Sequence, residues 1–201
     1  KVIGRAGVGV DNIDLAAAQD NNLTVVNAPV ATTTSVAELT MGLIFSLARE
    51  IPRADAHMKR GDWIKKQLIG VELKNKSLGI IGYGHIGTTV GKLAASIGMR
   101  INAYDALLKP ESTAVAGGKL LSFDEVITSS DFITIHTPLT DETRNLINKD
   151  VISKMKDGVF IINAARGGII DEAALLDGLN SGKIGGAALD VYLKEPPTNQ
   201  D

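Results

Sequence analysis

The sequence predicts an α/β protein built on a doubly wound parallel sheet, with helices covering both faces of the sheet. Short runs rich in isoleucine and valine alternate along the chain with segments of helical period. These short runs are apolar almost throughout, which is typical of parallel strands covered on both sides. Glycine supplies 21 of the 201 residues, above the ~7% average, which indicates tight turns where the backbone approaches a ligand.

From residue 78 onward, strands and helices are predicted in regular alternation, as a parallel sheet with helical crossovers requires. Ser122 and Glu125 have the spacing of a capping box, and Asp171 can cap the last helix. The predicted strands are Leu78–Ile81, Ile101–Tyr104, Phe132–Ile135, Val159–Asn163 and Ala187–Val191. The predicted helices are Ile86–Ile97, Phe123–Thr128, Lys149–Met155 and Asp171–Leu179.

The beginning of the chain follows a different pattern. A short strand at Val2-Ile3, a glycine-rich loop, a helix over Leu15–Asp20 and a strand over Leu23–Val26 come first. A long helix over Val36–Arg49 then has its apolar residues on one face. We interpret 27–34 as a hinge and predict two domains, 1–28 and 29–201. The strand already in progress at residue 1 and the loop at 196–201 predict a fragment of a longer chain.

Composition excludes several classes of function. The 21 basic and 23 acidic residues give a net charge of −2, which argues against nucleic-acid binding. No apolar stretch approaches the ~18–20 residues of a membrane span. Without cysteine there is no disulfide, thiol nucleophile or Cys-ligated zinc, and a reducing, cytoplasmic location is compatible with this. No metal-ligand spacing is present, so we expect no metal.

The central motif is a G-x-G-x-x-G formed by Gly82, Gly84 and Gly87. It follows a predicted strand and opens a predicted helix, and Asp105 ends the next strand 18 residues after Gly87. This is the Rossmann-type dinucleotide fingerprint: the glycines permit the turn, the approach of the pyrophosphate and close helix packing. The helix N-terminus attracts phosphate. A carboxylate at Asp105 accepts from ribose hydroxyls and repels a 2′-phosphate, so NAD is predicted over NADP.

Polar residues at later strand ends can face the same edge of the sheet. Arg166 follows a predicted strand and can grip a carboxylate, or it can form a surface ion pair. Asp190 lies near the end of the last predicted strand and Glu195 follows that strand; either acid can reach the same edge or be a solvated loop residue. We interpret His136 as a group near the cofactor and His57 as a surface residue.

The motifs together resemble the D-2-hydroxyacid dehydrogenase family over essentially the whole chain. Beyond the fingerprint, the resemblance is carried by Gly4–Asn12, Ser35–Leu39, His136–Pro138, Asn163–Gly168, Ala188–Val191 and the run that ends in Glu195-Pro196-Pro197. It implies that residues 1–28 are the C-terminal piece of a substrate-binding domain and that 29–201 are an NAD-binding domain.

The resemblance also implies roles for individual residues. His85 and Ile86 are expected to meet the pyrophosphate, Asp105 the ribose and Asp190 the nicotinamide carboxamide. The residues implied to contact NAD are Gly82, Gly84, His85, Ile86, Gly87, Asp105, Thr137, Ala164, Ala165, Arg166 and Asp190.

For catalysis, the resemblance implies that Arg166 binds the substrate carboxylate and carbonyl. Glu195 corresponds to the carboxylate that pairs with a catalytic histidine and raises its pKa; that histidine is expected beyond residue 201. Val8 and Gly9 correspond to the loop that receives the substrate carboxylate. Val8, where relatives can carry a hydroxyl residue, and Thr32, where some carry asparagine, leave the substrate open.

The implied activity is oxidation of a small D-2-hydroxyacid by hydride transfer to NAD. Glyoxylate, hydroxypyruvate, D-lactate or another 2-oxoacid remain alternative substrates, and a non-catalytic NAD(H)-sensing module is the alternative from another class. The resemblance also implies a homodimer or higher oligomer through the helix from Val36 and the segment Arg60–Trp63. Trp63 is either an interface anchor or a residue packed on its own domain.

Overall fold

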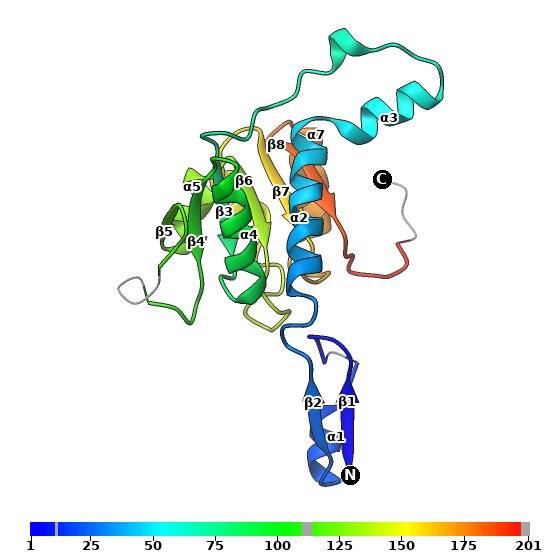
Figure 1. The fold of residues 1–201 in the computed structure, drawn as a ribbon, viewed down its shortest axis with the longest axis vertical. Helices are drawn as coiled ribbons and strands as arrows, with labels where there is room; N and C mark the ends of the chain where they lie inside the picture. The colour runs from blue at the N-terminus through cyan, green and yellow to red at the C-terminus, as the bar shows by residue number, and fades with distance from the viewer. Residues whose placement is uncertain (11, 110–113, 198–201) are drawn as a thin grey trace.

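The chain is described by a computed structural model over residues 1–10, 12–109 and 114–197. It contains a six-stranded sheet in the order β5-β4-β3-β6-β7-β8 and a separate two-stranded sheet formed by β1 and β2. Figure 1 shows the small sheet standing apart from the large one. Asp11 of the glycine-rich motif and the predicted terminal loop from residue 198 lie outside the described residues.

All neighbouring strands of the large sheet are parallel, so the predicted doubly wound parallel sheet is confirmed. Its central strand β3 is buried at all five residues. The strands are β3 (Ser77–Ile81), β4 (Arg100–Tyr104), β5 (Gly118–Leu120), β6 (Phe132–Ile135), β7 (Val159–Asn163) and β8 (Ile184–Leu189).

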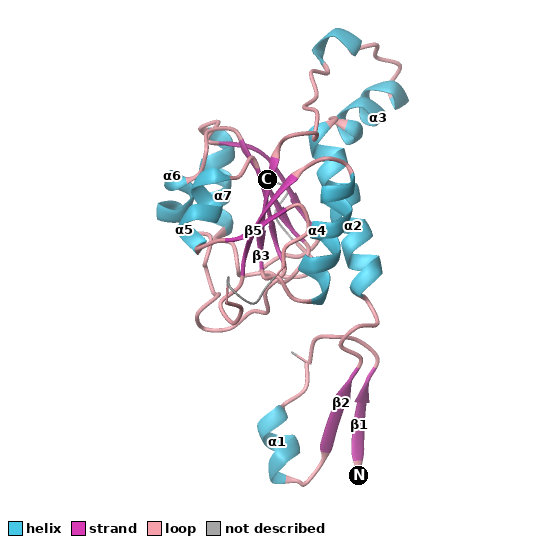
Figure 2. Cartoon of the chain, turned by 60° about the vertical axis from the view of Figure 1, so that its left-hand side comes forward, coloured by secondary structure: helices cyan, strands magenta, loops and turns pink. Residues whose placement is uncertain are grey.

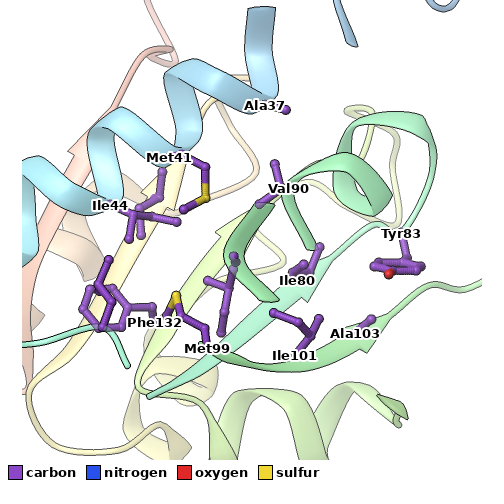
Figure 3. Packing of buried hydrophobic residues seen from close by; sticks show 14 of the residues in the cluster. Ala37, Met41, Ile44, Ile80, Tyr83, Val90, Met99, Ile101, Ala103 and Phe132 are labelled. Atoms are coloured by element: carbon purple, nitrogen blue, oxygen red, sulfur yellow. The ribbon is translucent and has the colours of Figure 1, made fainter. Parts of the chain in front are cut away.

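Helices cover both faces of this sheet. One face packs against α2 and α4, where Met41, Ile44 and Val90 meet Ile80 and Ile101 of the strands (Figure 3). The other face packs against α5, α6 and α7. Buried side chains therefore alternate between the two helical layers along each strand. The helices are α2 (Thr33–Ala48), α4 (His85–Ser96), α5 (Phe123–Ser129), α6 (Lys149–Lys154) and α7 (Glu172–Asn180).

The predicted caps are present. Ser122 and Glu125 form a capping box at the start of α5. Asp171 accepts hydrogen bonds from two backbone N–H groups in the first turn of α7. Because these bonds satisfy N–H groups that a helix start leaves unpaired, the caps fix where both helices begin.

Residues 1–10 and 12–27 form the small unit. Strands β1 (Val2–Arg5) and β2 (Thr24–Asn27) pair in parallel around helix α1 (Leu15–Asp20). Figure 2 shows this unit beyond the start of α2, joined to the large domain by one connection. The division into 1–28 and 29–201 agrees with this arrangement and remains our proposal.

An arm leaves the large domain between α2 and β3. It consists of α3 (Ile51–Lys59), a 3₁₀ turn at Lys65–Gln67 and extended chain, and it projects from the body (Figures 1 and 2). The sequence pattern does not predict α3. Trp63 on the arm is 76% exposed, so the alternative that it packs on its own domain is wrong.

Two strands differ most from the sequence prediction. The last strand begins at Ile184 and ends at Leu189, not at 187–191, because Gly185 and Gly186 conceal its start in a pattern-based prediction. Strand β5 was not predicted: it has three residues, only one of them buried, and lies at the edge of the sheet. No helix in the described part of the chain is long and apolar enough to cross a membrane.

Candidate functional site

The three glycines of the fingerprint occupy structurally distinct positions between β3 and α4. Gly82 has φ +92°, and a Cβ there would lie 2.7 Å from the carbonyl group of His136. A Cβ at Gly87 would collide with the carbonyl oxygen of Gly82. At Gly84 a Cβ would meet nothing within 4 Å. Gly82 and Gly87 therefore allow close packing, and Gly84 leaves open space at the helix start.

Helix α4 begins at this open position. Gly84 is its N-cap and supplies no side-chain hydrogen bond. The first intrahelical partner of its carbonyl is the Thr88 N–H, at 2.9 Å. The N–H groups of His85 and Ile86 belong to the first turn, and the N–H groups of a first turn have no acceptor within the helix. Together with the helix dipole, this makes the position fit the pyrophosphate of a dinucleotide.

Asp105 lies beside the glycine turn, directly after β4. One carboxylate oxygen accepts from the Tyr83 N–H at 2.9 Å, and the other accepts from the Leu107 N–H at 2.9 Å. The turn and the acid are also joined by the Gly82 N–H, which donates to the Tyr104 carbonyl at 2.8 Å. The structure thus brings together the phosphate turn and the carboxylate expected to bind ribose.

His136 and Thr137 directly follow β6, on the other side of the glycine turn. The His136 Nε2 lies 3.0 Å from the Thr134 hydroxyl, and burial lowers the pKa of His136 to about 4. The His136 Nδ1 and the Thr137 Oγ1 are buried and have no hydrogen-bond partner among the described residues. Buried polar atoms normally find partners, so these two atoms are suited to a polar ligand at this edge.

Arg166 lies in the loop after β7. Ala164 is buried, while Ala165 and Arg166 are half-buried. The Arg166 Nη1 donates to the Ala165 carbonyl at 2.7 Å. This holds the guanidinium against its own loop, close to the carboxyl end of the sheet.

Asp190 and Glu195 follow β8, and both are exposed. The Asp190 N–H donates to the carbonyl of Asn163 at 2.9 Å. The Glu195 carboxylate accepts from the Tyr192 N–H at 3.1 Å. Because β3, β6, β7 and β8 are neighbours and parallel, the glycine turn and the loops that carry Thr137, Arg166 and Asp190 meet at one edge, where ligands of such sheets bind.

Val8 and Gly9 lie in the small unit, not in the large domain. The Asn27 side chain donates to the Val8 carbonyl at 2.7 Å, and the Arg5 Nε donates to the Gly9 carbonyl at 3.3 Å. Figures 1 and 2 show this loop at the end of the small unit that faces the large sheet. These contacts shape the loop to which the family resemblance gives the role of receiving the substrate carboxylate.

The sequence motifs assign no separate role to Asn163. The structure buries its side chain beneath the Arg166 loop. An asparagine at the end of an otherwise apolar strand was the available signal. Among the described residues, no cluster of acids and histidines is arranged to hold a metal.

The family model described as "D-isomer specific 2-hydroxyacid dehydrogenase, NAD binding domain" matches residues 41–201. The chain is 50% identical over 198 residues to D-3-phosphoglycerate dehydrogenase of Archaeoglobus fulgidus, covering 98% of this chain and 38% of that protein. It is 50% identical over 200 residues to hydroxypyruvate reductase of Thermotoga maritima, covering 100% of this chain and 64% of that protein.

Among solved structures, an NAD-dependent formate dehydrogenase from Staphylococcus aureus in complex with NAD superimposes with a TM-score of 0.89 at 38% identity. That match covers 99% of this chain and 60% of the other. The chain therefore spans only part of the proteins it matches. With the fingerprint, the acid after β4 and the family match over most of its length, the chain belongs to the D-isomer specific 2-hydroxyacid dehydrogenases and carries their NAD-binding domain.

Proposed function

We propose that the protein containing this chain oxidises D-3-phosphoglycerate to 3-phosphohydroxypyruvate with NAD, the reaction that opens serine biosynthesis. The observation that carries the NAD-linked chemistry is the meeting of the fingerprint turn, Asp105, Thr137, Arg166 and Asp190 at one edge of the sheet. The identity to D-3-phosphoglycerate dehydrogenase over nearly the whole chain supports the substrate.

Bound NAD supplies the acceptor for the hydride that leaves C2 of the hydroxyacid. The first turn of α4 binds the pyrophosphate with its N–H groups. Asp105 accepts hydrogen bonds from the ribose, and its negative charge disfavours NADP. Asp190 orients the nicotinamide by accepting from its carboxamide. These residues fix the position of the cofactor, which keeps the transfer distance short.

Arg166 holds the substrate. Its guanidinium forms two parallel hydrogen bonds to the substrate carboxylate. Val8 and Gly9 of the small unit offer backbone N–H groups to the same carboxylate. The hydroxyl proton passes to a general base, which the family resemblance implies is a histidine paired with Glu195. A carboxylate beside such a base would favour its protonated form, and this is the role we propose for Glu195.

A second candidate substrate is hydroxypyruvate, as the acceptor in the reverse direction of hydride transfer. It is favoured by the equal identity to hydroxypyruvate reductase, of which this chain covers the larger share. Initial rates of the natural full-length protein separate the candidates. The substrates to compare are phosphoglycerate or D-lactate with NAD, and hydroxypyruvate or glyoxylate with NADH. Tight NADH binding without turnover of any of them supports the sensing module instead.

We also propose a cytoplasmic homodimer or higher oligomer assembled through the arm. Met58, Trp63 and Ile69 on this segment are each more than half exposed. Large apolar side chains on a projecting segment are typical of an oligomer interface. A monomeric mass for the natural full-length protein in light scattering would contradict this proposal.

A further inference from the structure

Asn163 is the last residue of β7, an interior strand between β6 and the edge strand β8. It pairs with Ile135 of β6 and Leu189 of β8, and it is only 2% exposed. Both ends of its buried amide are used. The Oδ1 accepts from the Ala165 N–H at 3.0 Å, and the Nδ2 donates to the Arg166 carbonyl at 2.9 Å.

The backbone of Asn163 reaches the second functional loop. Its carbonyl accepts from the Asp190 N–H at 2.9 Å. The two loops also touch directly, because a Cβ at Gly167 would collide with the carbonyl of Tyr192. One buried residue therefore contacts both the segment that carries Arg166 and the segment that carries Asp190.

We infer that Asn163 is a positioning residue for the nicotinamide end of the site: its side chain sets the backbone of residues 164–166 against the cofactor. This inference rests on the proposed NAD-linked function. The amide is suited to the task because it offers one acceptor and one donor in fixed geometry, matched to one N–H and one carbonyl. Removing it leaves both backbone groups without their buried partner, which favours other loop conformations.

The test compares NADH with ADP-ribose, which lacks nicotinamide, by calorimetric titration of the natural full-length protein. For Asn163→Asp and Asn163→Ala we expect NADH binding to weaken about tenfold, the loss typical of one or two hydrogen bonds. ADP-ribose binding stays within about twofold, because the fingerprint and Asp105 are untouched.

Asn102→Asp is the matched control. Asn102 lies in β4 of the same sheet, and its side chain donates one hydrogen bond to the Ser129 hydroxyl at 2.9 Å. This hydrogen bond does not involve the loop that carries Arg166 or the loop that carries Asp190. We expect both ligands to bind this variant within about twofold of the unmodified protein.

The pH dependence of NADH binding separates a positioning role of Asn163 from a general loss of structure. In Asn163→Asp a carboxylate oxygen faces the Arg166 carbonyl, and two acceptors repel each other. A protonated carboxyl donates instead, so NADH affinity should recover between about pH 8 and about pH 5.5 in this variant and not in Asn163→Ala. The Ala165 amide, deprived of its acceptor, should exchange its hydrogen faster in Asn163→Ala.

Three results are decisive against the inference. NADH affinity unchanged in both variants overturns it, and so does an equal loss for NADH and ADP-ribose, which indicates a structural role alone. If Asn163→Ala does not fold, an Asn163→Asp variant without recovery at low pH overturns it. If the unmodified protein binds neither ligand, the proposed function itself is overturned. This outcome is distinct from the three above, which require an unmodified protein that binds NADH.

Discussion

Gly82 and Gly84 are two residues apart in the fingerprint, yet the structure predicts opposite effects of alanine at the two positions. A Cβ at Gly82 would lie 2.7 Å from the His136 carbonyl carbon and oxygen and 2.9 Å from Thr137 Cγ2. Ordinary contact begins near 3.4 Å, so β6 and the turn would have to separate by about 0.7 Å. The left-handed φ of +92° adds backbone strain.

The overpacking costs about 1–3 kcal/mol, and the left-handed backbone costs about 1–2 kcal/mol. Gly82→Ala should therefore lower the free energy of unfolding by about 2–5 kcal/mol, which for a chain of this size lowers Tm by roughly 5–20 °C. Gly84→Ala adds a methyl group in open space, so its unfolding free energy stays within about 0.5 kcal/mol. That methyl nevertheless blocks the approach to the first turn of α4, and NADH binding should weaken at least about tenfold.

Thermal unfolding by circular dichroism and calorimetric titration with NADH measure the two effects separately. A Gly82→Ala variant that melts at the temperature of the unmodified protein would refute the close approach between the turn and β6. A Gly84→Ala variant that binds NADH with unchanged affinity would refute the start of α4 as the pyrophosphate site. Equal melting losses in both variants would refute the distinction between the glycines.

Three further predictions concern other parts of the chain. Burial lowers the pKa of His136 to about 4, so its imidazole is neutral at pH 7 and protonates more readily in the unfolded chain. The associated stability, at most about 3 kcal/mol, is present above about pH 6.5 and is lost as the pH falls toward 4; urea unfolding of His136→Gln should lack this loss, and an NMR titration with an ordinary pKa would contradict it. Burial raises the pKa of Asp131, but hydrogen bonds from Ser77 and Lys156 outweigh it and lower the pKa overall. Asp131→Ala should therefore lower the unfolding free energy by about 1–3 kcal/mol, measured by urea titration at pH 7; an unchanged midpoint speaks against these bonds. Trp63→Glu should convert the oligomer to monomers in light scattering while moving the unfolding free energy of the monomer by less than about 0.5 kcal/mol, because the side chain is 76% exposed; an unaltered mass rules out this arm as the interface.

Most elements of the large domain follow from local patterns. The apolar runs that form β3, β6 and β7 are short and bounded by glycine or polar residues, and the capping residues Ser122 and Asp171 mark helix starts. These signals depend on residues only three or four apart, so they can be identified without knowing the fold. Edge strand β5 escapes such reasoning because it has three residues and only one is buried.

The arm was missed for a related reason. Helix α3 has no buried residue, so it lacks the apolar stripe that predicts a helix packed on its own core. In the sequence, its apolar residues are mixed with charged ones, so the segment shows no regular helical pattern. Only the folded chain shows that the segment projects from the domain (Figure 1). In this position the Trp63 side chain is left exposed.

The candidate site divides in the same way. The sequence by itself determined the dinucleotide fingerprint, because the glycine spacing, the helix start and the acid after the next strand lie within 24 residues, from Gly82 to Asp105. Tertiary structure alone decided that His136 is buried and neutral, and that Asn163 contacts two loops at once. These properties arise from contacts between segments far apart in the chain. Burial and hydrogen-bond partners of that kind exist only once parallel strands have brought those segments to one edge.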